Sequence, residues 1–259
     1  AGIAQFEKSL PNARLVALFE TAFYQWTSPA SYSYAIPRAW RDIGIRRYGF
    51  HGASHKFIAE RSAELCGRED VAQIARRLYL DGPAAVSGKP FRVVSCHLGG
   101  SSSVTGILNG VSIGTSMGFS PQSGLPQNNR VGELDSGAIP YAMRTLGLSL
   151  DEAERQLTKE SGLLALSGVS NDVRYVKASA ASGNAAAKRA LDAMVHSIRH
   201  WIGAFMIEMG GIDALVFTAG IGENGDDTRA AVCANLDSFG LKLDTTKNAA
   251  CRATEADIS

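Results

Sequence analysis

The segment VVSCHLGGSSSVTGILNGVSIG, residues 93–114, constrains the fold more than any other part of the chain. It is typical of short strands, because its β-branched and apolar residues are broken at intervals by glycine and asparagine. The predicted strands are Phe91–Cys96, Ser102–Leu108 and Val111–Thr115. The pair Asn109-Gly110 joins the last two and is a strong hairpin signal, since both residues tolerate a positive φ. We therefore predict a β-meander.

The turn between the first two strands, Gly99–Ser103, combines two glycines with three serines. Glycine inside strand-like sequence costs order and packing, so a cluster usually marks a tight turn or a close approach of the backbone to a ligand. Backbone N–H groups in such a turn can surround a phosphate. One glycine-rich hairpin is weak evidence, however, and a second loop is needed to support it.

A second glycine-rich loop occurs in the C-terminal half of the chain. It follows a long helix whose apolar residues repeat with a period of 3.6 and which ends at Gly210-Gly211. The apolar stripe consists of Leu191, Met194, Val195, Ile198, Ile202, Phe205 and Met209. Residues 214–217 (ALVF) then predict a buried strand, TAGIGEN a glycine-rich turn, and residues 226–236 a helix. Two backbone-lined loops on one sheet would suit an extended nucleoside triphosphate.

Three further signals organise the rest of the chain. A helix is predicted from Ser54 to about Cys66, where Gly67 stops it. The stretch LDGPAAVSGKP, residues 80–90, breaks all periodicity, and we place a domain boundary there. The sequence SLDE, residues 149–152, fits a capping box and predicts the start of another helix.

Composition excludes several classes of partner. The 259 residues are 45% hydrophobic, and 26 basic residues against 25 acidic ones leave a net charge of +1. No long run of one sign suggests a nucleic-acid or membrane-surface patch. The four cysteines are widely spaced without C-x-x-C, and no apolar run reaches the roughly 20 residues of a membrane span. We expect a reduced, cytoplasmic protein, and the opening AGIAQ without Met suggests a fragment.

Two pairs of histidines lie four residues apart. His51 and His55, in RYGFHGASHK, could be structural residues at a helix start, or hydrogen-bond donors to a reacting anion. As a metal site the pair is poor, because no third ligand lies nearby at ligand spacing. His196 and His200 flank the apolar stripe of the long helix, and we interpret them as structural.

Two polar loops carry arginines that allow two interpretations each. Arg130, in NNRVGELD, could form a surface ion pair with its acidic neighbours, or a fork on a transferring phosphoryl group. Asp172 and Arg174, in SGVSNDVR, could contact a ribose or base edge, or simply cap a helix. The loops alone do not decide between these interpretations.

Four motifs taken in order resemble the acetate and propionate kinase family. They are RRYGFHGASH, CHLGGSSSVTGILNGVSIGTSMGFSP, SGVSNDVR and FTAGIGEN. The resemblance runs from FEKSLPNARLVALFETAF to about Leu243, with a loop insertion expected between Arg68 and Pro90. It implies the α/β fold of the sugar-kinase, heat-shock-chaperone and actin (ASKHA) superfamily, with two domains and a cleft between them. Residues 1–90 would finish the first domain, and residues 91–259 would form most of the second.

The resemblance also implies a reaction: reversible transfer of the ATP γ-phosphoryl group to a short carboxylate, with Mg²⁺ bridging the phosphates. The product is an acyl phosphate, and the family suggests a homodimer. A carboxylate is already a nucleophile, so positioning and charge stabilisation should carry the catalysis.

Site residues follow from the resemblance by motif. His51, Arg130 and Glu20 match catalytic positions, and Phe50 and Pro121 match walls of the acyl pocket. The residues matching the nucleotide and phosphate side are His55, His97, Gly99, Gly100, Ser101, Asp172, Arg174, Gly220, Ile221 and Asn224.

The chain departs from the family pattern inside the expected site. Glu20 replaces an aspartate, Gly100 and Ser101 replace Asn and Gly, and Gly114 replaces another aspartate. An N-terminal phosphate motif and a C-terminal metal-associated glutamate would lie outside the chain. These departures leave an alternative, a degenerate paralogue that binds nucleotide without turnover. A sugar or glycerol kinase is a third interpretation, in which only Glu20 could serve as the general base.

Overall fold

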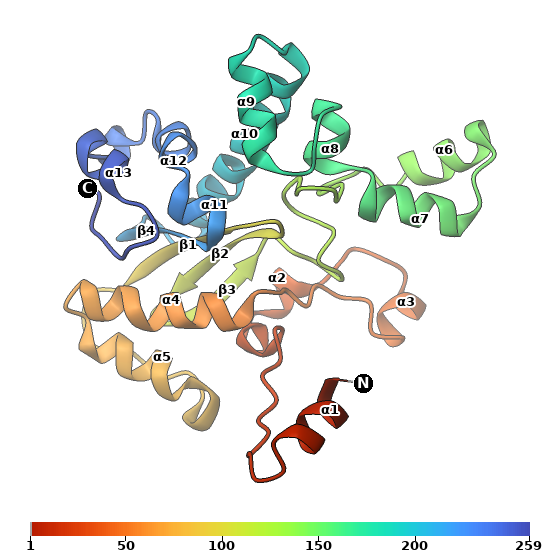
Figure 1. Cartoon of the computed structure of the whole chain (residues 1–259). Coiled ribbons are helices and arrows are strands. Elements are labelled where there is room, and N and C mark those ends of the chain that lie inside the picture. Colours follow the sequence, from red (N-terminus) through yellow and green to blue (C-terminus); the bar gives the residue numbers. More distant parts are fainter. Residues whose placement is uncertain (1) are drawn as a thin grey trace.

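The computed structural model describes residues 2–259 and is built around one mixed sheet with helices on both faces (Figure 1). The strands are β1 (Arg92–Leu98), β2 (Ser102–Leu108), β3 (Val111–Thr115) and β4 (Ala214–Thr218). The helices before the sheet are α1 (Gly2–Ser9), α2 (Pro29–Tyr32), α3 (Arg38–Asp42), α4 (Gly52–Leu65) and α5 (Glu69–Asp81). Those after the meander are α6 (Ala138–Leu146), α7 (Leu150–Lys159), α8 (Gly162–Ser167), α9 (Val173–Ala181), α10 (Ala185–Glu208), α11 (Ala219–Asn224), α12 (Asp226–Cys233) and α13 (Thr245–Ala250).

The predicted meander is confirmed. The strands lie in the order β3-β2-β1-β4, and β1, β2 and β3 pair antiparallel as consecutive neighbours. Asn109 and Gly110 adopt φ values of 52° and 82° between β2 and β3, as a tight hairpin of primed type requires. The predicted strand at residues 214–217 is also present, but it pairs parallel with β1 at the edge of the sheet and is half-buried rather than buried.

The α10 side of the sheet is apolar over most of its length. Val94, Cys96 and Leu98 point from β1 to this side, because alternate residues of a strand share a face. They pack with Val104 of β2 and with the stripe of α10 that was read from the sequence. Helix α10 thus covers one face of the sheet (Figure 1).

The opposite side of the sheet changes from apolar to polar along the strands. Here β1 presents Val93, Ser95 and His97, which pair with Ile107, Thr105 and Ser103 of β2. The apolar end packs against α4 and α5 in a second buried cluster. The polar end lies beneath the start of α4, so the hydroxyl and imidazole side chains of β1 and β2 gather there.

The loop insertion expected between Arg68 and Pro90 is largely wrong, because residues 69–81 form helix α5. Val71, Ala72, Ala75 and Leu78 recur at helical spacing and are all fully buried. The irregular stretch therefore begins only after Asp81, where Gly82 stops the helix.

The other predicted helices are present with small changes. Ser149 and Glu152 form the reciprocal capping box at α7, α4 starts two residues earlier than predicted, and α12 ends at Cys233. The turn predicted for TAGIGEN is wrong in detail, since its last six residues form helix α11. The second buried cluster contains residues from both sides of position 90, and the division into 1–90 and 91–259 stays a prediction. Among the described helices, none is both long and apolar enough to cross a bilayer.

Candidate active site

Three imidazole rings meet at the polar end of the sheet. His51 stands at the N-cap of α4 in a left-handed conformation (φ 59°), which is uncommon outside glycine and tends to occur at functional sites. His55 follows one helical turn later and is fully buried. His97 comes from β1, and its ring lies over that of His51 with 4.0 Å between centroids. Its Nδ1 lies 2.9 Å from Ser54 Oγ.

Serine hydroxyls hold two of these rings. His51 Nδ1 lies 2.8 Å from Ser103 Oγ on β2. His55 lies between two hydroxyls, with Nε2 2.8 Å from the same Ser103 Oγ and Nδ1 2.8 Å from Ser95 Oγ on β1. Both serines are fully buried, so these contacts are shielded from competing water.

The surroundings of the rings favour neutral imidazoles. Burial, followed by the neighbouring His97 and Arg130, lowers the pKa of His51 to about 4. Burial lowers the pKa of His55 well below its usual value, with further contributions from the other two histidines. Burial also lowers the pKa of His97, although the nearby Glu223 carboxylate opposes this effect. At neutral pH the cluster can therefore donate and accept hydrogen bonds but carries little charge.

Arg130 supplies the positive charge. Its Nη1 donates to Ser101 Oγ at 3.0 Å and to the carbonyl oxygen of Pro121 at 3.4 Å. Gln127, only 1% exposed, accepts from the Ser101 hydroxyl at 2.8 Å and from Arg130 at 3.4 Å. No ion pair joins Arg130 to the acidic residues at 133–135 among the residues that the structure describes. The guanidinium is thus directed to the glycine turn rather than to its acidic neighbours.

Arg130 and His51 reach the same short stretch of chain from two sides. The partner of Arg130 is Ser101 and that of His51 is Ser103. Two residues of extended chain span about 6 to 7 Å, so the two side chains are held close together. The effect of the guanidinium on the pKa of His51 has the same origin.

The two glycine-rich loops lie side by side because β1 and β4 are parallel. In their register His97 is opposite Thr218, so both strands end at the same edge of the sheet. A Cβ atom placed on Gly99 would lie 3.5 Å from that of Ala219, the first residue of α11. The Glu223 carboxylate accepts from the backbone N–H of Ala219 at 3.0 Å and so occupies the start of α11.

Comparison with known proteins places this arrangement in a family. The profile of the acetokinase family matches residues 1–259. The chain belongs to the acetokinase family. It is 40% identical over its whole length to an acetate kinase of Syntrophomonas wolfei subsp. wolfei, and covers 60% of that protein. It is 44% identical over 95% of its length to a propionate kinase of Citrobacter rodentium, of which it covers 57%.

A solved structure agrees with the sequence relatives. The crystal structure of Porphyromonas gingivalis acetate kinase superposes with a TM-score of 0.87 at 34% identity, over 99% of this chain and 60% of that one. The match confirms the predicted α/β fold class, that of the sugar-kinase, chaperone and actin superfamily. The chain spans about 60% of the length of these acetokinase-family relatives.

The remaining residues predicted from the family pattern are distributed around the central cluster. Phe50 precedes His51, and its carbonyl oxygen accepts from the Tyr24 hydroxyl at 2.6 Å. Pro121 contributes its carbonyl oxygen to Arg130. Gly100 is exposed on the glycine turn, where an added Cβ would lie 3.4 Å from the side chain of Asn128.

The predicted nucleotide residues of α11 sit on that short helix rather than in an open turn. Gly220 and Asn224 are exposed, and the Asn224 side-chain amide donates to the Gly220 carbonyl at 3.0 Å. Ile221 packs against the core on the α10 side of the sheet. The acetokinase-family motif FTAGIGEN therefore covers the end of β4 and the whole of α11.

Asp172, Arg174 and Glu20 are not joined to the central cluster. Asp172 caps α9 by accepting from the Arg174 backbone N–H at 2.9 Å, and its carboxylate forms an ion pair with the same arginine. Lys177 of α9 pairs with Asp227 of α12, so the helix that Asp172 caps lies beside α12. Glu20 is exposed, and its described contact toward α4 is made by its carbonyl oxygen, which accepts from the Gly52 N–H at 2.9 Å.

Sequence reasoning missed the groups that support the named residues. Ser95, Ser103 and Gln127 orient the histidines and Arg130, and Glu223 occupies the start of α11. One partial signal was available: Ser95 lies on the predicted strand 91–96 and His97 directly follows it, so both share a face if the extended chain continues by one residue. The pairing of Ser103 with His97 across two strands could not be read without the register.

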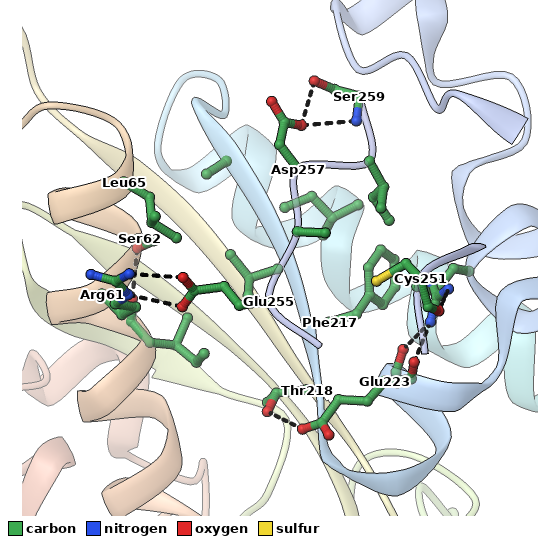
Figure 2. A pocket seen from close by; sticks show the side chains of 18 of the residues that line it. Arg61, Ser62, Leu65, Phe217, Thr218, Glu223, Cys251, Glu255, Asp257 and Ser259 are labelled. Carbon is green, nitrogen blue, oxygen red and sulfur yellow. Dashed lines mark hydrogen bonds and ion pairs between the residues drawn. The ribbon is translucent and has the colours of Figure 1, made fainter. Parts of the chain in front are cut away.

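A cavity of about 730 Å³ lies beside the candidate site and not within it. Figure 2 shows it between α4, the outer edge of β4 and the C-terminal segment, where the Glu255 carboxylate forms a two-point contact with the Arg61 guanidinium. None of the predicted site residues lines this cavity. Thr218 and Glu223 connect the two regions, since both line the cavity and both lie at the junction of β4 with α11.

Proposed function

We propose that this protein takes part in reversible phosphoryl transfer from ATP to a short carboxylate, acetate or propionate, giving the acyl phosphate and ADP. Membership of the acetokinase family supports this proposal. The observation that carries it is the approach of Arg130 and His51 to Ser101 and Ser103, beside two glycine-rich loops. A positive group and a neutral donor therefore flank the place where backbone could hold phosphates.

The chemistry fits this arrangement. The in-line transition state of phosphoryl transfer spreads negative charge over the equatorial oxygens, and the catalyst must stabilise that charge. In the proposed site Arg130 supplies the charge, and neutral His51 supplies a hydrogen bond. No general base is needed, because the acceptor carboxylate is already ionised at neutral pH.

The other residues take roles around this centre in the proposal. Phe50 and Pro121 form walls of a small acyl pocket, and Glu20 takes the position of a catalytic carboxylate. The phosphate side consists of His97, Gly99, Gly100 and Ser101. His55, predicted for the same side, is fully buried with both ring nitrogens on serine hydroxyls, and it supports this side through Ser103. The adenosine side consists of Asp172, Arg174, Gly220, Ile221 and Asn224. This division is supported by the parallel pairing of β1 with β4, after which Gly99 and Gly220 follow the ends of the two strands.

No step of the proposal is assigned to a metal ion. Residues 2–259 contain no group of three His, Cys, Asp or Glu side chains arranged to hold one. Mg²⁺ usually keeps several waters and binds through substrate phosphates with one or two carboxylates. A magnesium ion that accompanies ATP would therefore depend on the nucleotide for most of its ligands.

The whole protein is proposed to act in the cytoplasm as a homodimer. Exposed apolar side chains support the dimer, since Ile207 of α10 is 82% exposed and Phe239 is 62% exposed. Both line a shallow groove at the C-terminal end of α10.

A coupled assay for acetyl phosphate formation tests the function. Arg130→Ala should lower the rate by about 10³-fold, as expected for an arginine that stabilises transferring phosphoryl charge. Arg144→Ala, on exposed α6, is the matched control and should leave the rate unchanged. An Arg130→Ala rate equal to wild type would contradict the assignment. ATP binding by calorimetry without product would favour the degenerate-paralogue alternative, which the relatives named acetate and propionate kinase do not favour.

A further inference from the structure

A chain of four buried or half-buried side chains runs from the interior of the sheet to His51. In order they are Ser95, His55, Ser103 and His51, and each neighbouring pair is 2.8 Å apart. Ser95, His55 and Ser103 are fully buried. Within residues 2–259, the hydroxyls of Ser95 and Ser103 have no hydrogen-bond partner other than the two histidines of this row.

The direction of the hydrogen bonds follows from the Ser95 hydroxyl. A hydroxyl proton that is buried without an acceptor costs free energy, and His55 Nδ1 is the acceptor within reach. Ser95 must therefore donate to His55 Nδ1. A neutral imidazole carries one proton, so that proton of His55 lies on Nε2 and is donated to Ser103 Oγ.

The same argument applies once more at Ser103. Its oxygen accepts from His55, and its own proton then has His51 Nδ1 as its remaining acceptor. His51 Nδ1 must consequently be unprotonated. We infer that the Ser95–His55–Ser103 chain fixes His51 as the tautomer that carries its proton on Nε2, which makes these three residues positioning residues for a hydrogen-bond donor at the active site.

The chain also opposes the charged form of His51. An imidazolium would donate from Nδ1, so Ser103 would receive two donors and its own proton would be left without an acceptor. The groups that face His51 act in the same direction, because Arg130 and His97 both lower its pKa. This role rests on the proposed function only in assigning the Nε2 proton to a phosphoryl oxygen; the tautomer itself needs no substrate.

Long-range ¹H–¹⁵N correlation spectra of the ¹⁵N-histidine-labelled chain at pH 7 test the inference directly. The His51 signals are assigned by their loss in His51→Gln. We expect Nε2 to carry the proton and Nδ1 to show the shift of an unprotonated ring nitrogen, with a preference of about 5- to 150-fold that reflects one orphaned buried hydroxyl. A proton on Nδ1, or on both nitrogens, would overturn the inference.

A variant at Ser95, which is separated from His51 by His55 and Ser103, tests the direction of these hydrogen bonds. Ser95→Ala removes the first donor, so His55 can reverse and His51 should become a mixture of tautomers. Ser112→Ala removes another buried serine hydroxyl, on β3 outside the chain, and should leave His51 unchanged. An unchanged His51 tautomer in folded Ser95→Ala would overturn the inference. If Ser95→Ala does not fold, the wild-type spectrum still decides.

The two proposals fail separately. If His51 is protonated only on Nε2 and the protein forms no acyl phosphate, the proposed function is contradicted and the inferred hydrogen-bond directions are supported. If the protein forms acyl phosphate and His51 is protonated on Nδ1, the proposed function is supported and the inferred directions are contradicted.

Discussion

His51, His55 and His97 are titratable side chains that folding places in mutual contact and keeps uncharged. Their ring centroids lie 4.0 to 6.4 Å apart. Burial disfavours the protonated form of each ring and so lowers its pKa. A neighbouring histidine lowers the pKa of His51 and of His55 further. Protonation of any of these rings is therefore less favourable in the folded chain than in the unfolded chain.

The free energy of unfolding should consequently fall when the pH is lowered from 7 to 5. In the unfolded chain these histidines bind protons near pH 6.5, whereas in the folded chain the pKa of His51 is about 4. Stability from these groups is present above pH 6.5 and is lost toward the lower folded value. The fully buried His55 alone can give a slope of up to about 1.4 kcal/mol per pH unit.

Urea unfolding at several pH values between 7 and 5 measures this slope. Carboxylates contribute little there, because their unfolded pKa values lie near 4. His51→Gln removes one of the responsible groups and should make the slope shallower. A stability that does not change over this range would contradict the neutral cluster.

At the residue scale, the sequence permitted the prediction of groups that belong to contiguous motifs. His51 and Arg130 could be named because motif and chemistry agree on them. Ser95 and Gln127 could not, since their roles depend on how α4 packs on β1 and on the path of the 121–130 loop. The choice left open for Arg130 is clearer in the structure, which directs its guanidinium to Ser101.

At the scale of elements, the β-meander and α10 were predictable because each shows one clear period. Helix α5 was missed, since the glycine and proline residues directly after position 81 are typical of a loop and its own apolar stripe is short. Helix α11 was missed because the glycines of TAGIGEN are typical of a turn, although tertiary packing makes the segment helical.

One strand position shows how closely sheet and helix approach. A Cβ atom on Gly106 of β2 would lie 2.6 Å from Cδ1 of Phe205 on α10 and 3.0 Å from Cγ1 of Ile113. Gly106→Ala should therefore overpack the core and lower the free energy of unfolding by about 1 to 3 kcal/mol. Urea denaturation with an unchanged m-value would measure the loss.

Gly203→Ala is the matched control for this substitution. Gly203 lies within α10, and nothing is within 4 Å of the added Cβ. Alanine favours the helix there, so stability should stay equal or rise by up to about 1 kcal/mol. Equal effects of the two glycine substitutions would show that Phe205 does not restrict position 106.

At the scale of the whole molecule, one buried arginine joins the end of the chain to the candidate site. Arg229 of α12 is 2% exposed and has no carboxylate partner among the described residues. Its guanidinium donates to the carbonyl oxygens of Gly222, Glu223, Asn248 and Cys251, and to the Asn248 side chain. It therefore holds α11, α13 and the segment after α13 in one arrangement.

Arg229→Lys keeps the charge but cannot reach these acceptors together. Several buried carbonyls would lose their donors, each at a cost of about 1 to 3 kcal/mol, so the free energy of unfolding should fall by at least about 3 kcal/mol. Thermal or urea unfolding measures the change. Arg189→Lys, on the exposed side of α10, should stay within about 0.5 kcal/mol of wild type. A similarly small effect at position 229 would contradict the linking role.

Strand β1 has neighbours in every direction, since it pairs with β2 on one edge and β4 on the other and is covered by helices on both faces. Its alternate residues serve two different ends, apolar packing toward α10 and the serine and histidine groups toward α4. Random mutagenesis should therefore find this heptapeptide among the least tolerant stretches of the gene. Sequence change in β1 is restricted by two independent requirements, packing toward α10 and the polar groups toward α4. A replacement that satisfies one of them will usually violate the other.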